Sequence, residues 1–126
     1  MTTLDMLDRV LILLERGWCK GSFARDADGE STDPLDPKAV KWCLWGACIA
    51  AAGGTQRQHE VMEAIQSAFL TLHPDVEPHP QDAIYASDLL HRMADWNDMP
   101  HRTVEEVVEL VLKTRRTLRF YGLSVT

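Results

Sequence analysis

The most apolar stretch of the chain runs from Ala39 to Ala52, where Lys41 is the only charged residue. Apolar side chains on every side of a helix, rather than along one stripe, predict burial of most of its surface. Asp36 can cap the first turn, the proline after it suits the first helical position, and Gly53-Gly54 favours a stop. The pattern therefore predicts a buried central helix over 37–52, shorter than the ~20 residues that a membrane span needs.

Apolar residues at helical spacing predict four further helices. The first has a leucine stripe and either Thr2 or Thr3 as its cap. The last begins at a capping box formed by Thr103 and Glu106. In chain order, these helices are expected over 4–16, over 57–72, over 81–93, and from 103 to the basic residues near 116.

Two stretches depart from the helical pattern. Residues 17–37 are rich in glycine, proline and aspartate and can turn at Asp28-Gly29, whereas the tail alternates apolar and polar residues. We therefore expect a mainly α fold of about five helices packed around 37–52, with a small β-hairpin or strand pair near 18–32 and 117–125. At 126 residues, the chain is expected to form a single globular domain over 1–126.

The net charge limits the class of partner. The formal charge is −6, which argues against nucleic acid because phosphate binding needs clustered Lys and Arg. The basic run 113–119 is typical of a helix end, where cations complement the dipole. An acidic surface instead suits a basic protein partner.

The cysteines indicate a reducing compartment. There are three, Cys19, Cys43 and Cys48, and an odd count with two in the most apolar stretch favours buried free thiols. The first residues contain acidic side chains and too short an apolar run for a signal peptide. We expect a cytoplasmic protein with no membrane association.

One short motif resembles part of a calcium-binding loop. Asp26-Ala-Asp28-Gly29 matches its third to sixth positions, but Ala24 stands where the first aspartate belongs and Leu35 where the bidentate glutamate belongs. Because two ligands are missing, the motif favours a hydrogen-bonded turn over a calcium site.

The thiols do not form a metal or catalytic motif. Cys43 and Cys48 are five residues apart, which on a helix directs them about 140° from each other, unlike the ligands of one tetrahedral ion. Cys19, next to Lys20 in a polar loop, is the thiol expected nearest to solvent and to a cation that would lower its pKa. With no recognisable catalytic set, we expect no metal and no cofactor, and the sequence argues against an enzyme.

Residues 95–103 hold the greatest concentration of reactive side chains. A ligand pocket is one interpretation, with Trp96 as its floor and an arginine clamping an anion. A structural turn is the other, in which Asn97 and Asp98 bond backbone amides and Trp96 fills the core; the pattern favours the turn. The candidate ligand-binding residues are Arg25, Asp26, Asp95, Trp96, Asn97, Asp98, His101 and Arg102.

The central apolar stretch also offers a candidate partner surface. Trp45 follows Lys41 by about one helical turn, so it is expected to be partly exposed beside a charge, as interface hot spots often are. Core packing is the commoner outcome for such a residue. Gly46 costs about 1 kcal/mol relative to alanine in a helix, which suggests that another backbone or a ring packs closely against it.

Three sequence blocks resemble an uncharacterised group of small bacterial and phage-borne proteins of unknown function. The blocks are GWCxG…ARDAxG at 17–29, WCxxGA at 42–47 and WNDxxxRT at 96–103. The resemblance extends from about Leu4 to Thr114. It implies that the three blocks meet in space and that the chain has a mobile-element origin, and it implies no activity.

Two functional hypotheses follow. The first is a cytoplasmic, non-enzymatic protein-interaction domain that uses Lys41 and Trp45, for example a phage-type, anti-CRISPR-like inhibitor of a host defence complex. The alternative is a small-molecule-binding protein or small enzyme with a polar pocket formed by 25–28 and 95–103. A concave pocket that holds these groups with perturbed acidities would favour the alternative.

Overall fold

The computed structural model describes residues 2–72 and 93–125, with side chains over 2–69 and 93–119. The prediction of a mainly α fold with a small sheet is confirmed. The helix expected over 81–93 lies outside the described residues apart from its last position, and residues 93–98 are helical, so the first four residues expected in the 95–103 turn belong to a helix. The elements with defined bounds are α1 Thr3–Arg16, β1 Ala24–Arg25, β2 Lys41–Trp42, α2 Leu44–Ala51, α3 Gln58–Leu72 and α5 Val104–Val125.

Helix α1 begins at the predicted cap. The Thr2 hydroxyl accepts a hydrogen bond from the Asp5 amide at 3.1 Å, and the Asp5 carboxylate accepts one from the Thr2 amide at 2.9 Å. These reciprocal bonds satisfy two amides that have no partner within the helix. The buried face of α1 packs against α2 and α5 and consists of Met6, Leu7, Val10 and Leu14.

The central helix is shorter than predicted. Helix α2 begins at Leu44, so the prediction that it starts at 37 is wrong. The Asp36 carboxylate accepts the Lys38 amide at 2.8 Å and forms a local turn in place of a helix cap. The cap is Cys43, whose sulfur accepts the Gly46 amide at 3.2 Å. The predicted stop is confirmed, because the helix ends at Ala51 and its C-cap, Ala52, directly precedes the glycine pair.

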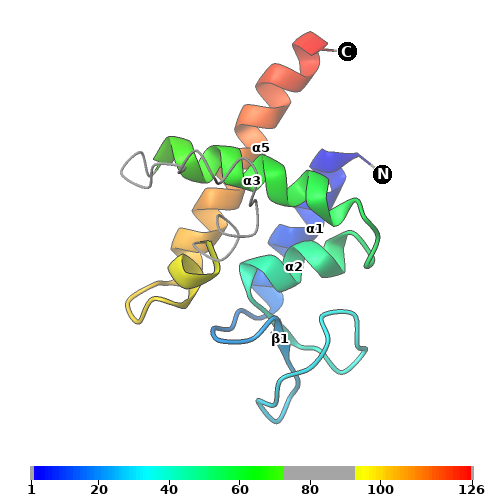
Figure 1. The fold of residues 1–126 in the computed structure, drawn as a ribbon, viewed down its shortest axis with the longest axis vertical. Coiled ribbons are helices and arrows are strands. Elements are labelled where there is room, and N and C mark those ends of the chain that lie inside the picture. The colour runs from blue at the N-terminus through cyan, green and yellow to red at the C-terminus, as the bar shows by residue number, and fades with distance from the viewer. Residues whose placement is uncertain (1, 73–92, 126) are drawn as a thin grey trace, which may run out of the picture.

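The residues before α2 are extended because they pair with another part of the chain. Strand β1 runs antiparallel to β2, with Ala24 opposite Trp42 and Arg25 opposite Lys41. The turn predicted at 28–29 is present, since the Asp26 amide donates to the Glu30 carbonyl at 2.9 Å. This strand-and-turn region lies at the end of the molecule opposite the projecting last turns of α5 (Figure 1).

The strand predicted in the tail is wrong, because α5 is helical through Val125. Its start is the predicted capping box, in which the Glu106 carboxylate accepts the Thr103 amide at 3.1 Å. The short alternation after 117 is compatible with either structure, and the helix that begins at Val104 continues through it. None of the helices within the described residues is long and apolar enough to cross a membrane.

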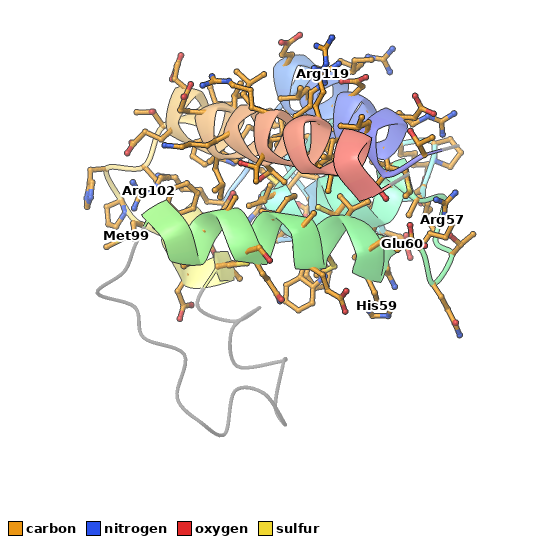
Figure 2. The ribbon with its side chains drawn as sticks, turned by 90° about the horizontal axis from the view of Figure 1, so that it is seen from above. Arg57, His59, Glu60, Met99, Arg102 and Arg119 are labelled. Atoms are coloured by element: carbon orange, nitrogen blue, oxygen red, sulfur yellow. The ribbon has the colours of Figure 1, made fainter. Side chains whose placement is uncertain are left out.

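Helices α1, α3 and α5 enclose the core. Helix α3 lies beside α5 (Figure 2), and apolar side chains fill the space between them. An ion pair between Asp8 and Arg115, at 2.6 Å, also joins α1 to α5. The buried apolar residues that α3 and α5 contribute are Val61, Met62, Ile65, Ala68, Phe69, Val107, Leu110 and Val111.

Gly46 allows the 17–43 loop to pack directly against α2. A β-carbon at this position would lie 1.8 Å from the carbonyl oxygen of Phe23 and 2.7 Å from its carbonyl carbon. The expectation that another backbone packs closely here is confirmed. Because the obstacle is backbone rather than a flexible side chain, the loop would have to move to admit even a methyl group.

We predict that Gly46→Ala lowers the free energy of unfolding by about 3 kcal/mol in urea titrations. In an open helix the same change would add about 1 kcal/mol, so the sign of the effect tests the packing. Gly29→Ala is the control: its φ is +83° and no other heavy atom would lie within 4 Å of the new methyl group. It should cost only about 1 kcal/mol, and an equal loss in the two variants would contradict the steric explanation.

Candidate functional site

The three sequence blocks meet at the side chain of Asn97. This side chain is 1% exposed and lies in the helical segment 93–98. Its carbonyl oxygen accepts two hydrogen bonds, from the Trp18 indole at 2.8 Å and from the Leu44 amide at 3.2 Å. The Leu44 amide belongs to the first turn of α2 and has no partner within that helix. One acceptor atom therefore joins the loop that follows α1 to the start of α2.

The nitrogen of the same amide group makes the remaining connections. It donates to the Cys19 carbonyl at 3.2 Å and to the Asp98 carboxylate at 2.9 Å. The same Asp98 oxygen accepts the Gly21 amide at 3.0 Å. Asn97 thus uses two acceptor and two donor positions, which is the full capacity of its side-chain amide. It acts as a structural junction with no hydrogen-bonding capacity left for a ligand.

Trp96 and Arg102 form a second structural cluster. The Arg102 guanidinium lies 4.1 Å from the centre of the Trp96 ring, and its Nε donates to the Trp96 carbonyl at 2.9 Å. It also pairs with Glu106 at 2.6 Å, and its side chain is only 10% exposed. Phe69 meets the Trp96 ring edge to face, with centroids 5.8 Å apart. Arg102 and Met99 lie near the C-terminal end of α3 (Figure 2), and Arg102 is bound to its own fold.

The 25–28 candidates are engaged in their own loop. The Arg25 guanidinium donates to the carbonyls of Lys20 and Gly29, each at 3.0 Å. The Asp26 carboxylate accepts the amides of Asp28 and Glu30 at 2.9 and 3.0 Å, which is the predicted hydrogen-bonded turn. Asp95, His101 and Lys41 are exposed. The eight candidate residues therefore do not converge on one pocket.

A pocket of about 340 Å³ opens beside the Asn97 junction. It lies between the 21–23 loop, α2, α3 and the 93–98 segment. Of the predicted site residues, Asn97, Asp98 and the partly exposed Trp45 line it. The other lining residues were not predicted as site residues, because most of them are apolar residues at helical spacing, which is typical of core. These are Gly21, Ser22, Phe23, Cys43, Leu44, Cys48, Met62, Ile65, Met93 and Ala94.

The thiols beside the pocket are protonated. Burial raises the pKa of Cys43 to about 11 and also raises the pKa of Cys48. Cys19 is 7% exposed, so the expectation that it lies near solvent is wrong. Burial raises its pKa as well, although the charge of Arg25 opposes the shift. Because the thiolate is the nucleophile, none of these cysteines is activated. Within 2–69 and 93–119, no three His, Cys, Asp or Glu side chains are placed to hold a metal ion.

Comparison with known protein families gives a match over most of the chain. The model of a family of unknown function, DUF6197, matches residues 1–117. No curated protein and no solved structure matches the chain. The three blocks that meet at Asn97 all lie within the matched range.

We predict that Asn97→Ala lowers the free energy of unfolding by about 3 kcal/mol or more. The variant leaves the Trp18 indole, the Leu44 amide and the Cys19 carbonyl without this partner, and an unsatisfied buried polar group costs about 1–3 kcal/mol. Urea unfolding measures the loss. Asp95→Ala, an exposed change in the same helical segment, should stay within about 0.5 kcal/mol. If both variants lose equally little, Asn97 is not the junction.

The Cys43 thiol should make stability fall at alkaline pH. From about pH 9 the unfolded chain loses this proton, whereas the folded chain retains it up to about pH 11. Unfolding then releases a proton, so the free energy of unfolding should decrease by about 1.4 kcal/mol per pH unit between these values. Cys43→Ser keeps a capping atom without this titration. In this variant the free energy of unfolding should fall less steeply with pH, by about 1.4 kcal/mol per pH unit. Identical slopes in the variant and the wild type would show that Cys43 is not the titrating group.

Proposed function

The chain belongs to DUF6197, a family of unknown function, and we propose that it is a non-catalytic protein that binds a small apolar molecule between α2, α3 and the 93–98 segment. The pocket itself carries the proposal. Its volume of about 340 Å³ lies within the range of small-molecule sites, which are mostly apolar with a few polar groups. A concave pocket is the feature that favours a small-molecule-binding protein over a protein-interaction domain. Its lining is more apolar than the sequence predicted.

The inner wall supplies the affinity. Leu44, Ile65 and Met62 are buried core residues that also line the pocket, so a ligand there would contact the hydrophobic core directly. Each 100 Å² of apolar ligand surface removed from water contributes about 2.5 kcal/mol. Methionine side chains adapt to different shapes, and Met62 and Met93 suit a site that holds an apolar group.

The polar groups at the pocket support binding rather than catalysis. The Ser22 hydroxyl donates to the Ala24 carbonyl at 2.9 Å and has no histidine or carboxylate partner among the described residues. The amide of Asn97 is fully bonded, and Cys43 and Cys48 are protonated. General acid–base and nucleophilic catalysis both need a group poised to exchange a proton. Three free thiols also fit a reducing compartment such as the cytoplasm.

A protein-interaction domain is the second candidate. One observation favours it: three of the five large exposed apolar side chains among the described residues, Phe23, Leu35 and Val40, belong to the 17–43 loop, close in sequence to Lys41 and Trp45. With a net charge of −6, such a surface suits a basic partner, and a phage-type inhibitor of a host defence complex is one version. The protein-interaction domain becomes the favoured candidate if no small molecule binds in the pocket.

We predict that 4-phenylbutan-1-ol binds the wild-type protein and that Ala94→Phe abolishes binding. Ala94 lines the pocket and is partly buried, so the new ring would occupy the space that the ligand needs. Calorimetric titration measures affinity, and urea unfolding checks that the variant is folded; Ala94→Leu is a smaller obstruction if it is not.

Ala27→Phe is the matched control, because Ala27 is an exposed loop residue outside the pocket. It should bind the alcohol as the wild type does. Equal binding by wild type and a folded Ala94→Phe would place the ligand elsewhere and contradict the proposed site.

A further inference from the structure

We propose that the pocket selects organic amines, with the ammonium group bound at Asp98 and the apolar body inside. This inference rests on the proposed function, because it names the ligand class of the same pocket. It is drawn from three features around the opening of the pocket, which we call its mouth. These are a carboxylate, neighbouring cations that are hydrogen-bonded to backbone carbonyls, and a pair of aromatic rings.

Asp98 is the only acidic residue that lines the pocket within the described part of the chain. One carboxylate oxygen accepts the Gly21 and Asn97 hydrogen bonds at 3.0 and 2.9 Å, which fix the position of the group. Asp98 is exposed, and it forms no ion pair with any side chain in 2–69 or 93–119. A negative group held in place at the edge of an apolar cavity is suited to a ligand cation.

Two cations of the 17–43 loop, Lys20 and Arg25, direct their hydrogen bonds away from Asp98. The Lys20 ammonium donates to the carbonyls of Met99 and Pro100, at 2.6 and 3.2 Å, and lies 5.2 Å from the centre of the Trp18 ring. Arg25 donates to two backbone carbonyls of its own loop. Their charges weaken long-range attraction of a cation, so selectivity depends on direct hydrogen bonding to the Asp98 carboxylate.

Aromatic rings complete the mouth. Phe23 and Trp45 both line the pocket and meet at an interplanar angle of 64°, with centroids 5.4 Å apart. Phe23 is 46% exposed, so much of its side chain is accessible to a ligand. An ammonium group close to such faces is attracted by their quadrupoles, whereas a carboxylate would be repelled by both the rings and Asp98.

The test compares three probes that share one apolar body: 4-phenylbutylamine, 4-phenylbutan-1-ol and 4-phenylbutanoate. Each is titrated calorimetrically into the wild-type protein, Asp98→Asn and Asp95→Asn at neutral pH and low salt. Asp98→Asn removes the charge but keeps an oxygen that can accept the Gly21 amide. Asp95→Asn removes an exposed charge that does not line the pocket.

We expect the wild-type protein to bind the amine about tenfold or more tightly than the alcohol, and the carboxylate most weakly. In Asp98→Asn the affinity for the amine should fall to that for the alcohol. Asp95→Asn should retain the wild-type preference.

The two proposals fail in different ways. If the alcohol binds but the amine is not preferred, or if Asp98→Asn keeps the preference, amine selectivity is overturned and the apolar pocket stands. If none of the three probes binds the wild-type protein, the proposed function is overturned together with the inference.

Discussion

The buried amide of Asn97 is the interaction on which the rest of the structure depends. It joins the Trp18–Cys19 loop to the first turn of α2 through atoms of one side chain. An aspartate would offer acceptors only and leave the Cys19 carbonyl unbonded, and a leucine could replace none of the four hydrogen bonds. A fully satisfied polar group in a core also fixes one arrangement of the elements around it, because alternative packings lose several hydrogen bonds together. This arrangement of the elements also determines the shape of the pocket wall.

The short α2 follows from the same packing. Its first amide is satisfied by Asn97, and the Gly46 amide by the Cys43 sulfur, so the start of the helix is determined by groups outside its periodic pattern. The Phe23 carbonyl accepts the Cys43 amide at 3.1 Å and lies where a side chain of residue 46 would be. The loop therefore covers the beginning of α2 at a distance that only glycine permits, and this brings Phe23 to the mouth of the pocket.

Sequence reasoning succeeded where the controlling interactions are local. The caps at Thr2 and Thr103 and the stripe on α3 involve residues three or four apart, and all were predictable. It failed at the start of α2, because an aspartate followed by proline suits either a helix cap or a turn, and the choice depends on the pairing of Lys41 with Arg25. The pocket was missed for the same reason: its wall comes from separate elements, and each part alone resembles ordinary core.

Adjacent residues of the WND block lie in different surroundings, one in the core and one at the pocket. Asn97 is buried and directs all of its polar atoms at the protein, whereas Asp98, next in the helix, is exposed at the pocket edge. The bond of 2.9 Å between them means that the group holding the loop also orients the carboxylate. Because the Gly21 amide bonds to the same carboxylate oxygen, any movement of the 17–43 loop would shift both the aromatic and the anionic sides of the mouth. Stability of the junction and geometry of the pocket are therefore physically coupled, and the three blocks act as one unit.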